Sequence, residues 1–184
     1  MTNKHKIYYV FYIISGLLFF SNLSAMTKAQ YESNLLTVKI STNAPQSISA
    51  FYEARGFQKK MLDILRQHCF VSVFIRNKSK DFIWLDLSQW KLTNADGEIT
   101  RLDRNYWKAK WQTMDIPLAH QSIFRWTLIP EQLDFHPNER EGGNIILPRL
   151  DKPFNITATF PTKADKQGSP ITINFNNIEC ANNK

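Results

Sequence analysis

The sequence predicts a mainly β protein, an antiparallel β-sandwich with a short helical segment at about residues 48–67. The first observation is a series of short segments after this region, in which apolar and polar residues alternate and turn-forming residues intervene. The second is that no helical pattern separates these segments, as the crossovers of a parallel sheet would require. The third is the spacing of Phe57, Met61, Ile64 and Leu65, which places them on one helix face.

Each expected element follows from its local pattern. Residues 34–40, "NLLTVKI", alternate at their end and predict a first strand. Gly56 divides the helical segment into a short helix at about 48–55 and a longer one at 57–67. Further strands are expected at residues 68–77, 82–87, 89–92, 122–130, 143–148, 154–160 and 171–180. The side chains expected to help fill the space between the sheets include Val71, Val73, Trp84, Trp126 and Phe160.

Residues 26–184 are expected to form a single domain. No internal repeat, low-complexity segment or linker rich in Pro, Gly and Ser divides them, and their 159 residues are enough to bury a full core. The strand pattern is immunoglobulin-like in architecture, and this analogy by itself assigns no function.

The N-terminal residues have the three-part pattern of a secretory signal peptide. Lys4 and Lys6 give a positive start, residues 7–20 form an uncharged run, and polar residues then lead to the small Ala25. The run is shorter than the roughly 20 apolar residues that span a bilayer. We therefore expect residues 1–25 to be removed, leaving no membrane span, and the protein to be periplasmic or secreted. An uncleaved anchor is the alternative.

The chain has two cysteines, Cys69 and Cys180, and both lie outside the expected signal peptide. Thiols tend to pair in oxidising compartments, so we expect a disulfide that ties the last strand to the strand after the helices. On the chain-entropy model, closing this loop of 111 residues stabilises a fold by about 4–5 kcal/mol. Two buried free thiols are the alternative.

Charge and motifs argue against several classes of function. The formal net charge of +7 falls to about +5 without the two lysines of the signal peptide, which is far from the dense basic stripe of a nucleic-acid binder. The sequence contains neither a Gly-rich phosphate loop nor a Gly-x-Ser-x-Gly nucleophile motif. We therefore expect no nucleic-acid partner and no cofactor, and we predict no catalytic residues.

The stretch "RLDRNYWKAKW", residues 101–111, is the first candidate for a surface that binds a ligand or partner. Cations interleaved with aromatic rings can hold anionic polymers, sugars or nucleic-acid bases. The alternative is that the rings pack on the sandwich while the charges solvate its rim. The predicted binding residues are Arg101, Arg104, Tyr106, Trp107, Lys108, Lys110 and Trp111.

The stretch "DFHPNERE", residues 134–141, is the candidate for a metal site. Carboxylate and imidazole groups are ligands of zinc and calcium, and the candidate ligands are Asp134, His136, Glu139 and Glu141. Their spacing matches neither the regular ladder of a calcium loop nor the paired histidines of a helical zinc site. A solvated turn is the alternative.

The sequence thus predicts an exported, non-enzymatic β-sandwich that binds a protein partner or a cell-envelope component. The alternative from another class is a metal-binding or metal-dependent hydrolytic protein that uses the 134–141 loop. A third hypothesis is an assembly factor whose exposed sheet edge accepts a strand from a client.

Overall fold

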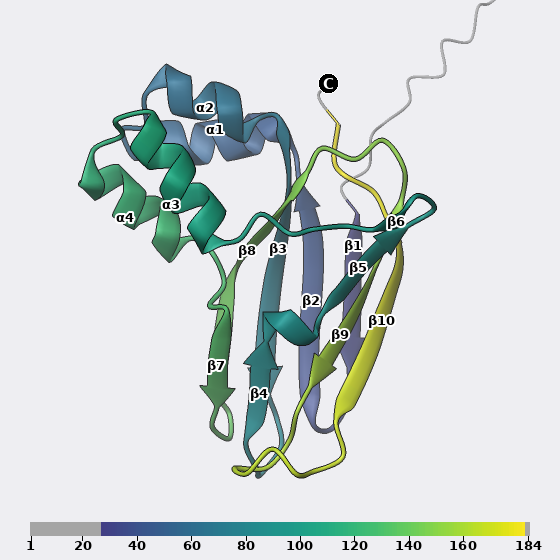
Figure 1. Ribbon diagram of the computed structural model, residues 1–184. Coiled ribbons are helices and arrows are strands. Elements are labelled where there is room, and N and C mark those ends of the chain that lie inside the picture. Colours follow the sequence, from purple (N-terminus) through teal and green to yellow (C-terminus); the bar gives the residue numbers. More distant parts are fainter. Residues whose placement is uncertain (1–26, 183–184) are drawn as a thin grey trace, which may run out of the picture.

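The computed structural model describes residues 27–182, so the predicted signal peptide at 1–25 lies outside the described residues. The strands are β1 (Lys28–Glu32), β2 (Leu36–Asn43), β3 (His68–Asn77), β4 (Ile83–Asp86), β5 (Lys91–Asn94), β6 (Gly97–Glu98), β7 (Gln132–Phe135), β8 (Arg140–Pro148), β9 (Phe154–Phe160) and β10 (Ile171–Ile178). The helices are α1 (Pro45–Glu53), α2 (Lys59–Leu65), α3 (Arg104–Thr113), α4 (Leu118–Trp126) and the 3-10 turn η1 (Leu87–Gln89). The protein is mainly β with antiparallel sheets, which confirms the predicted fold class (Figure 1).

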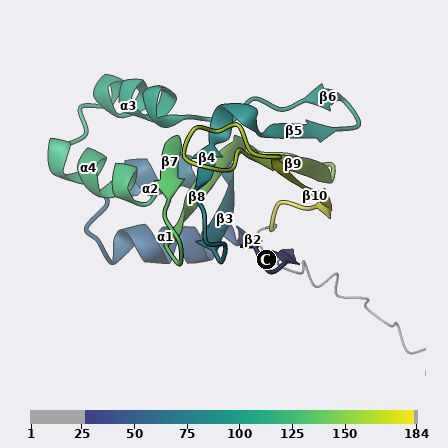
Figure 2. The same ribbon diagram turned by 90° about the horizontal axis from the view of Figure 1, so that it is seen from below.

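Two layers of strands form the sandwich (Figures 1 and 2). The first sheet has the order β1-β2-β3-β8 and the second the order β10-β9-β5-β6. The short pair β4–β7 continues the second layer, because Ile83 bridges to Thr162 just after β9 and Trp84 N–H donates to the Pro161 carbonyl at 2.8 Å. Every pairing between named strands is antiparallel.

The first hydrophobic core lies between these layers and follows the alternation of the strands. On β9, Phe154, Ile156, Ala158 and Phe160 are all fully buried, while the residues between them are half-buried. This is the period of two that a strand imposes on its side chains. The expected interior positions at Val71, Val73 and Phe160 are confirmed.

Two tryptophans expected between the sheets lie elsewhere. Ile83 and Leu85 take the interior positions of β4, so Trp84 between them faces outward, with Lys166 Nζ 4.3 Å from its ring centroid. Trp126 lies on a helix and is 78% exposed. The expectation is therefore wrong for both. In β4 the alternation marked two faces without saying which one is buried, and Trp126 belongs to a helix, where alternation does not apply.

Helices α1 and α2 confirm the helical segment predicted at about 48–67, although α1 is the longer of the two. Helices α3 and α4 are additional. Helix α4 contradicts the strand expected at 122–130: its buried Phe124 lies four residues before the buried Leu128, which is helical spacing. Among the described residues, no helix is long and apolar enough to cross a membrane.

The four helices form a second hydrophobic core beside the β3–β8 side of the first sheet (Figure 2). Phe70 of β3 and Ile146 of β8 are register partners, and both join the helical core while their neighbours Val71 and Ile145 join the sandwich core. The helices thus cover part of the sheet's outer face. The buried members of the helical core are Ile48, Tyr52, Phe57, Met61, Leu62, Leu65, Phe70, Trp107, Trp111, Ile116, Phe124, Leu128 and Ile146.

A chain of polar side chains links the sheet to the helices. Asn43 Nδ2 donates to Ser72 Oγ at 2.8 Å, Ser72 Oγ donates to Asn144 Oδ1 at 2.8 Å, and Asn144 Nδ2 donates to the Thr127 carbonyl at 3.1 Å. The Thr127 hydroxyl meets the Tyr52 hydroxyl at 2.6 Å. Burial raises the pKa of Tyr52 well above its ordinary value, so this hydroxyl keeps its proton. The chain fixes α1 and the end of α4 against the middle of the sheet.

Gly143 of β8 lets the segment after α4 approach the sheet edge. We expect Gly143→Ala to lower the free energy of unfolding by about 1–3 kcal/mol, since the new Cβ would lie 2.4 Å from Ile129 N. That backbone cannot move freely, because Ile129 N–H donates to the Asn144 carbonyl at 3.1 Å. Gly142→Ala is the matched control: its Cβ would lie 3.4 Å from the Val73 carbonyl oxygen. Equal denaturant midpoints for the two variants would contradict the prediction.

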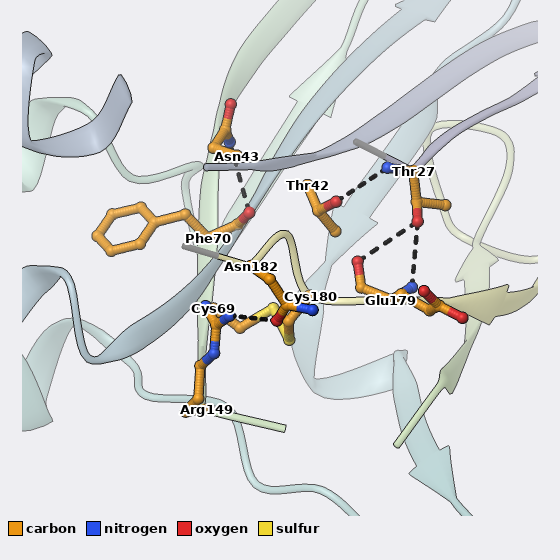
Figure 3. Close-up of a disulfide and its surroundings, with 9 residues drawn as sticks. All are labelled: Thr27, Thr42, Asn43, Cys69, Phe70, Arg149, Glu179, Cys180 and Asn182. Carbon is orange, nitrogen blue, oxygen red and sulfur yellow. Dashed lines mark hydrogen bonds between the residues drawn. A yellow bond between two sulfur atoms is a disulfide. The ribbon is translucent and has the colours of Figure 1, made fainter. Parts of the chain in front are cut away.

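The predicted disulfide is confirmed: Cys69, at the start of β3, is bonded to Cys180, just after β10, with a Cα–Cα distance of 5.5 Å (Figure 3). Hydrogen bonds hold the same end of the chain. Glu179 N–H donates to Thr27 Oγ1 at 3.2 Å, and Arg149 Nη2 donates to Asn182 Oδ1 at 2.7 Å. The disulfide fits a protein that folds in an oxidising compartment.

Candidate functional site: the groove between α3 and α4

Helix α3 turns its tryptophans inward, whereas Lys108 is exposed and Arg104 and Lys110 are half-buried. The helix begins at a capped end, where the Asp103 carboxylate accepts a hydrogen bond from Tyr106 N–H at 2.8 Å. Trp107 and Trp111 are one turn apart, and each is 1% exposed. Their ring centroids lie 5.1 Å apart, so the two indoles form a single aromatic surface under the helix.

Helix α4 completes this aromatic cluster. The Phe124 ring lies 5.0 Å from the Trp107 ring and 5.2 Å from the Trp111 ring, measured between centroids. On the other side it meets Tyr52 of α1 at 5.7 Å. Phe124 thus joins α4 to α3 and to α1.

A groove of about 520 Å³ lies between the two helices, and we call it the α3–α4 groove. This volume falls in the range of small-molecule and side-chain pockets. The groove is lined by apolar side chains together with basic and neutral polar ones, and no acidic residue lines it. The lining residues are Arg104, Asn105, Trp107, Lys108, Trp111, Leu118, Gln121, Ser122, Phe124, Arg125 and Leu128.

Three cations line the groove, and the described part of the chain gives none of them a carboxylate partner. Among residues 27–182, Arg104, Lys108 and Arg125 form no ion pair. Arg104 Nη2 donates to the Leu128 carbonyl at 2.9 Å, and its buried Nε has no hydrogen-bond partner in the described part of the chain. All three side chains carry a positive charge, so each of them would attract an anion in the groove.

Large apolar side chains are exposed beside the groove. Leu118 is 80% exposed and Trp126 is 78% exposed, and both lie on α4. Tyr106 on α3 is 41% exposed. Leu118, Ser122 and Trp126 follow one another at four-residue spacing and therefore lie along one side of α4. Exposed apolar surface next to unpaired cations is typical of an interaction site.

The structure separates the binding residues predicted at 101–111 into different environments. Arg104 and Lys108 line the groove, whereas Arg101 lies in a bidentate pair with Glu131, at 3.0 and 2.6 Å. Tyr106 is exposed, and Trp107 and Trp111 lie in the helical core with part of their surface lining the groove.

The last of these predicted residues, Lys110, is half-buried and does not line the groove. It lies near His68, whose pKa is lowered mainly by partial burial and further by the Lys110 charge.

Sequence reasoning missed the contribution of α4, because it assigned that segment to a strand. Leu118, Ser122, Arg125 and Trp126 supply one side of the site and its most exposed apolar groups. The four-residue spacing of Leu118, Ser122 and Trp126 is compatible with a helix, but the crowded apolar residues that follow Ser122 fit a strand almost equally well.

The candidate metal ligands at 134–141 are engaged in local contacts. Asp134 Oδ2 lies 3.7 Å from His136 Nε2. One oxygen of Glu139 accepts from the backbone N–H of His136 and one of Glu141 accepts from that of Gly142, both at 2.8 Å. In the described part of the chain, no three His, Cys, Asp or Glu side chains are grouped as metal ligands.

The fully buried side chain of Asn77 supports the turn between β7 and β8 through hydrogen bonds. Its Nδ2 donates to the carbonyls of Phe135 at 2.9 Å and Asp81 at 2.7 Å. The His136 ring packs on Phe82, with the ring centroids 4.4 Å apart. These contacts give the turn a structural explanation that needs no metal.

Comparison with known proteins gives no family. No protein-family model matches the chain. No curated protein matches it. Among solved structures, a putative lipoprotein (ycdA) from Bacillus subtilis subsp. subtilis strain 168 is similar at 14% identity and a TM-score of 0.43, covering 82% of this chain and 39% of that one. The yjhA protein from Bacillus subtilis is similar at 7% identity and a TM-score of 0.39, covering 71% of this chain and 76% of that one. This chain thus spans well under half the length of the ycdA protein, and at these values neither likeness indicates a function.

Proposed function

We propose that the protein is an exported, non-enzymatic module that binds a protein partner or a cell-envelope component through the α3–α4 groove. The observation that carries the proposal is the set of three cations around an aromatic floor, for which residues 27–182 supply no carboxylate partner. The group that the groove holds is anionic and partly apolar.

Energetic considerations support an anionic, partly apolar ligand. A carboxylate or phosphate in the groove forms charge-assisted hydrogen bonds with Arg104 and Arg125, and arginine can bind such groups through two parallel bonds. Covering a large exposed apolar side chain such as Leu118 or Trp126 contributes about 1.5–3 kcal/mol when burial is complete. Binding thus draws on charge and on apolar burial at the same place.

Export is supported by two independent features. The first is the signal-peptide pattern at residues 1–25. The second is the Cys69–Cys180 disulfide, since such bonds persist in oxidising compartments. A periplasmic or secreted location puts the groove in contact with envelope components or exported proteins.

The proposal is tested by photo-crosslinking with the full chain exported in its own host. A benzophenone amino acid at Ser122, in the groove, is expected to capture a specific adduct, and the same probe at Asn176, exposed on β10, is not. The charge-reversal variant Lys108→Glu/Arg125→Glu is expected to abolish the adduct, because it replaces attraction by repulsion.

The matched control for this experiment is Lys80→Glu/Lys91→Glu. It changes the net charge by the same amount at two exposed lysines that do not line the groove. If the adduct forms equally from both probe positions, or survives reversal of the groove charges, the α3–α4 groove is not the binding site.

A further inference from the structure

We infer that the occupant of the α3–α4 groove is an acidic, amphipathic α-helix of a protein partner. This inference rests on the proposed function and narrows it to one class of ligand. It follows from the shape of the groove, the spacing of its lining residues, the sign of its charge and the placement of its exposed apolar side chains.

The shape of the groove suits a third helix. Two helices of ten and nine residues form its walls, and at 1.5 Å per residue each wall is about 14–15 Å long. This is between two and three helical turns. Helices pack by placing the side-chain ridge of one into the groove of another, and a groove between two helices receives such a ridge over this length.

The lining residues recur at helical spacing on both walls. Arg104, Lys108 and Trp111 lie at positions i, i+4 and i+7 of α3. Leu118, Ser122 and Arg125 have the same spacing on α4. A helix whose apolar side chains recur at i, i+3 or i+4 and i+7 has anchors of matching period, as in other helix-in-groove complexes.

The charge of the groove selects an acidic partner. Cations stand on both walls, Arg104 and Lys108 on α3 and Arg125 on α4, above an apolar floor. A helix with an apolar stripe flanked on each side by Asp or Glu places carboxylates opposite these cations. A basic helix would meet like charges, which disfavour a close interface.

The exposed side chain of Trp126 extends the contact beyond the lining of the groove, to which Leu118 belongs. Leu118 and Trp126 are eight residues apart, which is about 12 Å along α4. Tryptophan is enriched among the residues that dominate binding energy at protein interfaces. Trp126, which is 78% exposed, is therefore the expected anchor at one end of the contact.

A membrane surface fits these observations less well. A bilayer surface does not fill a hollow between two helices. Helices that lie on membranes carry many Lys and Arg residues on their polar face, whereas α4 carries a single cation, Arg125. Helix α4 thus offers an anionic bilayer a single charge of its own, and the cations Arg104 and Lys108 of α3 line the hollow, which a bilayer surface does not fill.

The test is a selection from a displayed library of 18-residue peptides with helical hydrophobic periodicity and randomised flanking positions, using the disulfide-bonded protein. We expect the selected peptides to be enriched in Asp and Glu beside the apolar stripe. Each should lose affinity by about 100-fold against Lys108→Glu/Arg125→Glu and by about 10- to 30-fold against Trp126→Ala. Affinity for the control Lys80→Glu/Lys91→Glu should change by less than about threefold.

Two further measurements test whether the ligand is a helix and whether a membrane binds in its place. A proline in the middle of a selected peptide should abolish binding, because it breaks a helix. Vesicles containing phosphatidylglycerol should not bind in a manner that depends on Lys108 and Arg125. Peptides without acidic enrichment, peptides insensitive to charge reversal or to proline, and groove-dependent vesicle binding would each overturn the inference.

The outcomes separate this inference from the proposed function. If the Ser122 probe captures no groove-dependent adduct in the host, the proposed function fails. If it captures such an adduct while the peptide selection fails or the vesicles bind, the groove is a binding site and its occupant is not an acidic helix.

Discussion

Replacing both Cys69 and Cys180 with serine is expected to lower the free energy of unfolding by about 4–5 kcal/mol. The disulfide closes a loop of 111 residues, and on the chain-entropy model the loss of this cross-link frees the unfolded chain by that amount. Both cysteines are nearly inaccessible, at 2% and 6% exposure, so the serine hydroxyls also lie in apolar surroundings. Since domains of this size are stable by roughly 5–15 kcal/mol, the loss is a large share of the total.

The measurement is guanidinium chloride unfolding of the wild type and the double variant, each with and without dithiothreitol. The reductant is expected to shift the wild-type midpoint to lower denaturant and to leave the double variant unchanged. An oxidised wild type that unfolds at the same midpoint as the double variant would show that the cross-link does not stabilise the fold.

The second large effect is expected at the centre of the helical core. Phe124→Ala should lower the free energy of unfolding by about 3–5 kcal/mol, because it removes a fully buried ring and leaves a cavity. The cavity would open between Trp107, Trp111 and Tyr52, whose rings all contact Phe124. Tryptophan fluorescence and far-UV circular dichroism during denaturant unfolding would measure the loss.

Trp126→Ala is the matched control on the same helix. Its side chain is 78% exposed, so its removal should change the free energy of unfolding by no more than about 0.5 kcal/mol. The two variants thus separate stability from the proposed binding: Phe124 supports the floor of the groove, and Trp126 is the proposed contact with the partner. Similar losses of stability in both variants would contradict the burial described for α4.

The sandwich was predictable because strands bury every second residue. In β2, β9 and β10 the apolar residues alternate clearly, and the pairing of Cys69 with Cys180 followed from their number and the expected compartment. The same rule failed at 122–130, where Ile123, Phe124, Trp126, Leu128 and Ile129 are so close together that periods of two and 3.6 fit almost equally. Tertiary packing against Trp107 and Trp111 decides that α4 is a helix.

Only the α3 side of the candidate site was predictable from the sequence. The cations at Arg104 and Lys108 stand out in the sequence, and they line the groove. Their partners Leu118, Ser122 and Arg125 come from the second helix, and the contact between two helices depends on a fold that local patterns do not specify. Arg101 belonged to the same stretch by composition, but the neighbouring Glu131 neutralises it.

Strand β3 faces two cores at once, so both cores constrain its register with the neighbouring strands. Phe70 belongs to the helical core, while Val71 and Val73 belong to the sandwich core. A slip of β3 by one residue would exchange the two sets, forcing a bulky ring among the sandwich residues and a small valine into the space left among the helices. A misaligned β3 would thus disturb both cores, and this single strand links the packing of the sandwich to the packing of the helices that form the α3–α4 groove.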